Sequence, residues 1–454
     1  MRLADPDRRE RLRRAARVWR LTVRRGAAWS VLRVRGVGKD EEERARLDER
    51  FAIRTAEDVA RELGSMKGAM MKVGQMVSFI ADGLPPAARD ALATLQADVP
   101  PMAPTLAESV VRNELGDDPS RLFLDWAPVP VAAASIGQVH RAVLGDGREV
   151  AVKVQYPGID RAIRGDLDNA EVLYGLFAAA ALPSLDVRGV VDELRARMGD
   201  ELDYRIEARR QAAFAERYRG HPFIAVPAVV PERSARRVLT SEWVDGMRFA
   251  ELIAAPEPVR QRAAEIVFRF TQGSIHRHRT FNGDPHPGNY RFAPEGPVSF
   301  LDFGLVKRWS DAEWRALVSI IDPLLETDAE GTVAGLERAG FLRPGHGLDP
   351  RQVWEYVSGP YGPFLTPEHT FTPAWTSEAL TRLLQVKGPY AEVMAALDMP
   401  PSFVILDRVI WGVSAILGQL RARGPWRAIL DEYRCDGPPA TALGEQEAAW
   451  RARA

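Results

Sequence analysis

Asp284-Pro-His-Pro-Gly-Asn289 and Asp302-Phe303-Gly304 are the segments that decide the fold of this chain. The first pairs an Asp with an Asn as Asp-x-x-x-x-Asn, and its Asp stands eighteen residues before the Asp of the second. Phosphoryl transfer uses one carboxylate near the incoming nucleophile, and an amide oxygen with a second carboxylate on the magnesium ions at the phosphates. Asp284, Asn289 and Asp302 are these residue types in this order. The alternative is a Pro/Gly-rich turn followed by an ordinary strand end, and both segments would then resemble kinase motifs by coincidence. The pattern therefore predicts a nucleotide site.

The composition is that of a soluble globular protein. The chain has 454 residues, enough for two or three domains or lobes, with 46% hydrophobic and 27% charged residues. Its net charge of −1 conceals a basic N-terminus, where the first 35 residues contain twelve arginines. Cys435 is the single cysteine, which excludes an intrachain disulfide and indicates a reducing compartment. We therefore expect a cytoplasmic protein.

The apolar segments do not predict a membrane span. Phe403–Leu420 is apolar but interrupted by Asp407 and Arg408, and its helical repeat predicts a buried core helix. The members of this repeat are Val404, Leu406, Val409, Ile410, Val413 and Ile416. The arginines around Leu12 and Trp19 fit an amphipathic helix on the inner, anionic face of a membrane, and equally a solvated or disordered basic arm. No nucleic-acid-binding motif accompanies this charge, so we expect no nucleic-acid partner.

A nucleotide site also needs a lysine and a loop over the phosphates. Val150-Ala-Val-Lys153 follows a predicted hairpin, Ile136–Leu144 and Glu149–Gln155 joined by Gly145-Asp-Gly147, and places Lys153 on a strand. The loop before this hairpin has alanines where glycines are usual, and its members are Ala132, Ala133, Ala134 and Ser135. Alanine resists positive φ, so this loop should be stiffer than a glycine-rich one.

The lysine needs a carboxylate to orient it, and an acidic segment supplies three candidates. They are Glu201, Asp203 and Glu207, of which the last two would share one face of a helix. The same spacing fits a solvated helix surface, and the spacing alone does not separate the two interpretations. The histidines His276, His278 and His286 are separated by a helix end and a Pro turn, which favours structural roles over a metal site.

Six motifs in order resemble the UbiB/AarF-type atypical kinase family. They are Lys72-Val-Gly-Gln75, Ala132-Ala-Ala-Ser135, Val150-Ala-Val-Lys153, Glu201-Leu-Asp203, Asp284 to Asn289 and Asp302-Phe-Gly304. The resemblance implies an α+β, two-lobed protein-kinase-like fold with an N-terminal helical extension packed over the active site. It implies ATP or ADP with magnesium as cofactors, and a link to isoprenoid-quinone or related lipid metabolism, with isoprenoid lipid or lipid-biosynthesis enzymes as partners.

The resemblance also assigns roles to residues of this chain. It implies that Lys153 binds phosphate, that Glu207 is its ion-pair partner and that Asp284 is the catalytic Asp. Asn289 and Asp302 would be metal ligands. The remaining implied positions are regulatory for Lys72, Gln75, Glu201 and Asp203, and adenine-contacting for Glu242 and Val244. From the residues alone, Lys72 is a solvated lysine beside a Met-rich packing face.

The expected organisation is a basic arm over residues 1–40, a helical extension over 41–104, an N-lobe over 105–243 and a mostly helical C-lobe over 244–454. Thr105-x-x-Glu108 predicts a capping box at the start of the N-lobe. Asn282-Gly283 stands where the family usually has His-Ala, which we interpret as a tolerated turn change.

The predicted function is an atypical kinase or ATPase. No Ala-Pro-Glu segment follows Asp302-Phe-Gly304, which argues against bulky protein substrates. Two alternatives remain, a nucleotide-gated scaffold without turnover and a small-molecule phosphotransferase.

Overall fold

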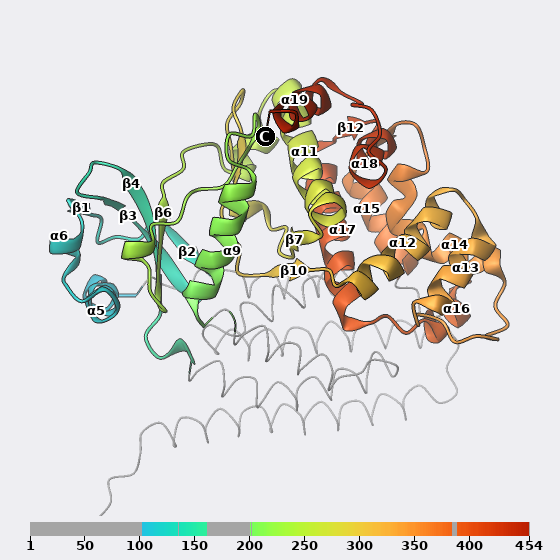
Figure 1. Cartoon of the computed structure of the whole chain (residues 1–454), viewed down its shortest axis with the longest axis horizontal. Coiled ribbons are helices and arrows are strands. Elements are labelled where there is room, and N and C mark those ends of the chain that lie inside the picture. The colour runs from blue at the N-terminus through green and yellow to red at the C-terminus, as the bar shows by residue number, and fades with distance from the viewer. Residues whose placement is uncertain (1–101, 135, 161–199, 201, 384–387, 454) are drawn as a thin grey trace, which may run out of the picture. The chain divides into compact units, whose positions relative to one another are not determined.

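The computed structural model describes residues 102–134, 136–160, 200, 202–383 and 388–453 (Figure 1). The basic arm and the predicted helical extension lie outside these residues, as do Ser135 and Glu201. The chain divides into two compact units. The first consists of Met1–Leu202 with Ala235–Leu239, and the second of Asp203–Ser234 with Thr240–Ala454.

The first unit is built on an antiparallel sheet. Its strand order is β1-β3-β4-β6, and β2 also pairs with β3. The strands are β1 (Asp125–Trp126), β2 (Ala132–Ala134), β3 (Gly137–Val143), β4 (Glu149–Gln155) and β6 (Val238–Glu242), of which Val238 and Leu239 belong to this unit. The hairpin of β3 and β4 confirms the predicted strands, and its turn is closed by a hydrogen bond of 2.9 Å from the amide of Gly147 to the carbonyl of Leu144. The valines of β4 alternate with Ala151 and Lys153 and are fully buried, so one face of the strand belongs to the core.

Two short helices precede the sheet, α5 (Pro104–Leu115) and α6 (Pro119–Leu122). The predicted capping box at Thr105 is wrong. The N-cap is Ala103, with no side-chain cap, and Pro104 occupies the first turn. Proline is tolerated at this position because the first amide of a helix has no intrahelical partner. The helix therefore begins before Thr105, which cannot act as its N-cap.

The second unit is mostly helical (Figure 1). Its longer helices are α9 (Tyr204–Arg217), α11 (Glu257–Gln272), α12 (Asp311–Leu325), α13 (Ala329–Arg338), α15 (Pro373–Leu383), α17 (Pro401–Leu420) and α19 (Ala442–Arg451). The shorter ones are α10 (Phe249–Ile253), α14 (Pro350–Val357), α16 (Ala391–Ala396), α18 (Trp426–Arg434), the π-helical turn η4 (Gly273–Arg277), and the 3-10 helices η3 (Pro231–Arg233), η5 (Pro287–Asn289) and η6 (Gly359–Phe364).

Small strand pairs complete the second unit. Their strands are β5 (Ile224–Ala225), β7 (Thr280–Asn282), β8 (Tyr290–Phe292), β9 (Val298–Phe300), β10 (Val306–Arg308), β11 (His369–Thr370) and β12 (Arg423–Gly424). The strand β5 ends at Ala225, and beyond it Val229 forms an isolated bridge with Ser241. The segment 358–375 contains η6 and β11 and ends in the first turn of α15.

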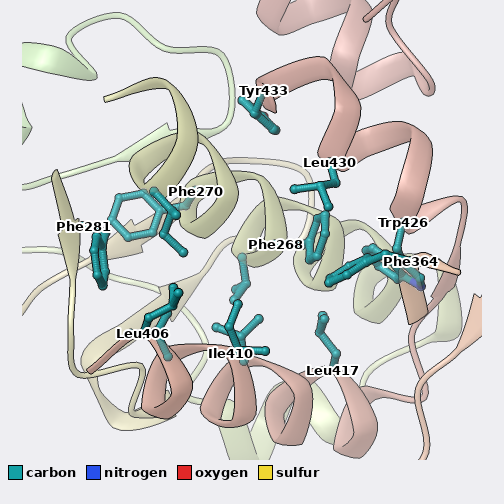
Figure 2. Packing of buried hydrophobic residues seen from close by; sticks show 14 of the residues in the cluster. Phe268, Phe270, Phe281, Phe364, Leu406, Ile410, Leu417, Trp426, Leu430 and Tyr433 are labelled. Carbon is teal, nitrogen blue, oxygen red and sulfur yellow. The ribbon is translucent and has the colours of Figure 1, made fainter. Parts of the chain in front are cut away.

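The core of the second unit lies between α11, α17 and α18. Phe268 and Phe270 of α11 lie near Leu406 and Ile410 of α17, and α18 adds Trp426, Leu430 and Tyr433 to the cluster (Figure 2). Such close-packed apolar side chains make removal of any one of them costly.

The helix α17 confirms the predicted buried helix. Five of the six expected apolar positions are buried, whereas Val404 is 54% exposed and lies outside the core. Within the part of the chain that the structure describes, the segment Ser402–Leu420 alone is long and apolar enough to cross a membrane, and 67% of its apolar window is buried. Its side chains pack in the core described above.

Candidate functional site

Two strand pairs bring the sequence motifs together in the second unit. The hairpin of β8 and β9 pairs Tyr290 with Phe300, and the amide of Leu301 donates to the carbonyl of Asn289 at 2.9 Å. The flanking strands β7 and β10 also pair, with Asn282 opposite Val306. The spacing of the motifs therefore has a structural reason. The residues between Asn289 and Asp302 form a hairpin, whose two ends lie side by side.

The Asp302-Phe303-Gly304 turn is held by the helix α9. Phe303 is fully buried, and its ring lies 4.7 Å from that of Phe214. Arg210, one turn earlier on α9, donates from Nη1 to the carbonyl of Gly304 at 2.7 Å. The turn is closed internally by a hydrogen bond of 2.9 Å from the amide of Gly304 to Oδ1 of Asp302. The backbone of the turn is thus tied to α9 by an aromatic contact and a charge-assisted hydrogen bond.

Glu207 lies in the first turn of α9 and is 6% exposed. Its Oε2 is 3.9 Å from the position that a β-carbon on Gly304 would take, so this carboxylate lies beside the turn. Asp203 does not share its helical face as expected. Asp203 is the N-cap of α9 and accepts from the amide of Arg205 at 3.0 Å, because an aspartate at a helix start satisfies an otherwise unpaired amide.

Asn282 joins the two motifs, and the sequence analysis underestimated it. Its Nδ2 donates to the carbonyl of Asp302 at 2.6 Å, and its Oδ1 accepts from the amide of Asp284 at 2.8 Å. Gly283 beside it is equally constrained, since a β-carbon there would lie 2.9 Å from Leu305 and 3.0 Å from Ile405. The sequence offered one signal for this role, because Asn282 stands where the family usually has His. A residue at this position needs a side chain that can bind the Asp284 and Asp302 segments together.

Arg408 of α17 is the second residue that the sequence analysis missed. Its Nη2 lies 2.5 Å from Oδ1 of Asp284, and the two side chains are 13% and 11% exposed. The signal was present, because Asp407 and Arg408 interrupt an otherwise apolar helix. A charged pair in such a helix requires partners when the helix is buried.

In the first unit, Lys153 lies in the middle of β4 opposite Val139. The alanine-rich segment is not the loop that was expected. Ala132, Ala133 and Ala134 form β2 and pair with Val139, Gln138 and Gly137. A β-carbon on Gly137 would lie 2.2 Å from the carbonyl oxygen of Val154, so this glycine is required by close approach of β4.

The segment expected to contact adenine follows β6. The carboxylate of Glu242 accepts from the amide of Ala228 at 3.0 Å, and its own amide donates to the carbonyl of Ala228 at 2.9 Å. Its side chain therefore stabilises the chain locally. The adenine contacts at Glu242 and Val244 stay a prediction, as do the roles of Lys72, Gln75 and Glu201 outside the described residues.

The oxygen ligands fit magnesium by their chemistry. Magnesium prefers carboxylate and amide oxygens and is usually bound through one or two protein groups plus phosphates. The Nδ2 of Asn289 is directed to the carbonyl of Asp284 at 3.5 Å, which leaves the amide oxygen for a cation. Asp302 uses Oδ1 for the turn and has a second carboxylate oxygen. Among the described residues no group of three His, Cys, Asp or Glu could hold a metal by itself.

The local environments of His276, His278 and His286 fit structural roles. Burial lowers the pKa of His276 to about 3 and that of His278 to about 4, so both are neutral at physiological pH. His286 accepts from the amide of Gly288 through Nδ1 at 3.1 Å and caps η5.

Comparisons with known proteins show the family of this chain. The model of the ABC1 atypical kinase-like domain matches residues 94–335. An uncharacterised aarF domain-containing protein kinase of Arabidopsis thaliana, named chloroplastic, is 34% identical over 60% of this chain and 38% of that protein. Protein ACTIVITY OF BC1 COMPLEX KINASE 1, chloroplastic, of the same plant is 29% identical over 75% of this chain and 50% of that protein. The chain thus spans half or less of the length of these curated relatives.

A solved structure extends the likeness to the fold. The structure of Rv3197 from Mycobacterium tuberculosis, in complex with erythromycin, is 34% identical to this chain. The two superpose with a TM-score of 0.61 over 82% of this chain and 93% of Rv3197. The predicted α+β kinase-like fold is confirmed. The chain belongs to the ABC1 atypical kinase-like family, the UbiB/AarF type that its six motifs resemble.

Proposed function

We propose that this chain binds a magnesium–nucleotide complex and hydrolyses ATP or transfers its phosphoryl group. Asn289 and Asp302 are the metal ligands, Lys153 binds phosphate with Glu207 as its partner, and Asp284 orients or deprotonates the acceptor. The observation that carries the proposal is the β8–β9 hairpin. Together with the hydrogen bond from Leu301 to Asn289, it keeps the two oxygen ligands at one end of the same small sheet.

Some residues of the chain are proposed to bind the magnesium–nucleotide complex, and others position these residues. Magnesium, when bound, neutralises charge on the phosphates and on the transferred group. Arg210 and Phe214 bind the Asp302 turn to α9, which restricts the position of the proposed metal ligand Asp302. Asn282 links the Asp302 turn to Asp284, because its side-chain amide binds the backbone of both residues.

The acceptor is proposed to be small, or water. The strand β10 ends at Arg308 and α12 begins at Asp311, with Ser310 as its N-cap. Protein kinases use a long segment at this place to bind a protein substrate. A connection of Trp309 and Ser310 alone has no length for such a segment. A small-molecule phosphotransferase remains an alternative within this proposal, and a screen of hydroxyl acceptors tests it.

A nucleotide-gated scaffold without turnover is the second candidate. The ion pair between Arg408 and Asp284 favours it, because it engages a carboxylate oxygen of the residue proposed to act on the acceptor. Binding of ATP and ADP with a large change in a partner's affinity, and no hydrolysis above background, would be its signature.

From the resemblance we propose a role in isoprenoid-quinone or related lipid metabolism, with a peripheral position on the inner face of a membrane. The basic arm over 1–40 supports contact with anionic lipid through its arginines. Isoprenoid lipids or lipid-biosynthesis enzymes are the partners that we propose.

One experiment separates turnover from binding alone. ATP hydrolysis is measured on the full chain with and without anionic vesicles, for the wild type, Asp302→Asn and the exposed control Asp311→Asn. We expect hydrolysis in the wild type and the control, stimulation by the vesicles, and loss of at least tenfold in Asp302→Asn. Equal rates in all three proteins would contradict the enzyme, and retained nucleotide binding in that case would support the scaffold.

A further inference from the structure

A cavity lies in the helical unit. It has a volume of about 200 Å³ and is formed by α14, η6, α15, and Tyr390 before α16. None of the motif residues of the candidate site lines it. Its lining is mixed: Tyr356, Trp375 and Tyr390 are aromatic and Leu365 is aliphatic, and charged side chains, small residues and Ser358 complete it.

The aromatic walls are held in place by their neighbours. The rings of Tyr356 and Tyr390 lie 5.8 Å apart, and the hydroxyl of Tyr390 donates to the Oε2 of Glu355 at 3.3 Å. Trp375 contacts the ring of Phe371 edge-on at 5.4 Å. Fixed rings cost little ordering entropy when a ligand binds, so this cavity is preorganised.

Acidic groups outnumber basic ones in the cavity lining. Glu355 and Glu378 are exposed and lie beside the aromatic walls, against a single guanidinium, that of Arg382. Glu355 also pairs with Arg351 at 3.3 Å, but that arginine side chain is 82% exposed and such a pair contributes little. Burial, with the charge of Asp407 as a smaller contribution, raises the pKa of Tyr356 to about 12, so this phenol stays neutral. The lining is therefore negative in sum and rich in π-faces.

We propose that this cavity binds an organic ammonium group carried on an apolar body. The faces of Tyr356, Trp375 and Tyr390 attract the cation through their ring quadrupoles, which is worth about 0.5–2 kcal/mol for each good contact. The carboxylates Glu355 and Glu378 add charge attraction at the mouth, and Leu365 contacts the apolar part. The small volume selects one ammonium group with a ring or a short chain.

The test uses the full chain and three probes of similar size, benzyltrimethylammonium, benzyl alcohol and benzoate. Binding is followed by ligand-detected NMR and calorimetry. We expect the cation to bind at least tenfold more tightly than the other two probes. Glu378→Gln should weaken it at least threefold and the double variant with Glu355→Gln about tenfold, while Glu392→Gln, an exposed acid outside the cavity on α16, should leave it unchanged.

An occluding variant provides an independent arm. Ala379 lines the cavity on α15, and Ala379→Trp should abolish binding of the cation at an unchanged melting temperature. Equal binding of the three probes would overturn the proposal, as would an equal effect of Glu378→Gln and Glu392→Gln. Preferred binding of benzoate would also overturn it, because Arg382 would then define an anion site. Asp302→Asn should not alter binding of the cation, so failure here and failure of the nucleotide proposal are separable.

Discussion

Arg408 of α17 and Asp284 before β8 form a buried ion pair, with 2.5 Å between Nη2 and Oδ1. The pair joins residues 124 positions apart in the chain. It attaches α17 to the segment from Asp284 to Asn289, so core packing and the position of Asp284 are coupled.

We expect Arg408→Ala to lower the free energy of unfolding by about 3 kcal/mol, since it leaves the carboxylate of Asp284 buried without a cation. Arg408→Lys keeps the charge but loses the planar fork, and should cost less. The double variant Arg408→Ala, Asp284→Ala should recover most of the loss, which a double-mutant cycle in urea measures. Additive losses in this cycle would contradict the coupling.

Arg210→Ala should lower the rate of ATP hydrolysis about tenfold, equivalent to about 1.4 kcal/mol, because the carbonyl of Gly304 loses its charged donor. Arg209→Ala is the matched control, since Arg209 is the neighbouring residue on α9 and is exposed. Steady-state kinetics check the prediction. The same rate for both variants would show that α9 does not position the Asp302 turn through this bond.

Asn282→Ala should destabilise the second unit by about 2 kcal/mol, because the amide of Asp284 and the carbonyl of Asp302 both lose their partner. Asn282→Asp keeps the acceptor and loses the donor, so it should affect the Asp302 side alone. Hydrogen exchange of the amides in the two segments distinguishes the effects. Unchanged exchange in both segments after Asn282→Ala is the contrary result.

Gly137→Ala should destabilise the first unit by about 2 kcal/mol, since its β-carbon would overlap the carbonyl of Val154 on β4. Gly145→Ala in the following turn meets no atom within 4 Å and is the control. Thermal unfolding of both variants tests the difference. A loss in Gly145→Ala as large as in Gly137→Ala would show that overlap with the carbonyl of Val154 is not the cause.

Asp407→Asn should stabilise the protein above pH 6 and have little effect at pH 4. Burial raises the pKa of Asp407 to about 6 from an ordinary value of 3.8, so the folded protein holds this proton more tightly than the unfolded chain. The wild type therefore loses stability as the pH rises from about 4 to 6, by at most about 3 kcal/mol, and the loss then persists. Melting temperatures of both proteins between pH 4 and 8 measure it. A constant difference across this range would exclude Asp407 as the cause.

Much of the fold and site followed from local patterns. The hairpin of β3 and β4 was predictable from alternation and a Gly-Asp-Gly turn, and α17 from its helical repeat. The Asp284, Asn289 and Asp302 spacing was readable because a short hairpin is a local structure. The capping box predicted at Thr105 was wrong because Pro104 already occupies the first turn of the helix. The predicted burial of Val404 was wrong because the helical repeat does not show how much of the apolar face the neighbouring elements cover.

The sequence by itself determined the family, the hairpin of β3 and β4 and the residue types of the motifs, since each depends on residue types at short spacing. Only the tertiary structure decided which distant groups hold them. Arg408 reaches Asp284 because α17 packs in the core, and Arg210 reaches Gly304 because α9 lies along the Asp302 turn. Asn282 has two partners because β7 pairs with β10. These contacts depend on which elements pack together, and packing is decided by the whole apolar core, which no local pattern contains.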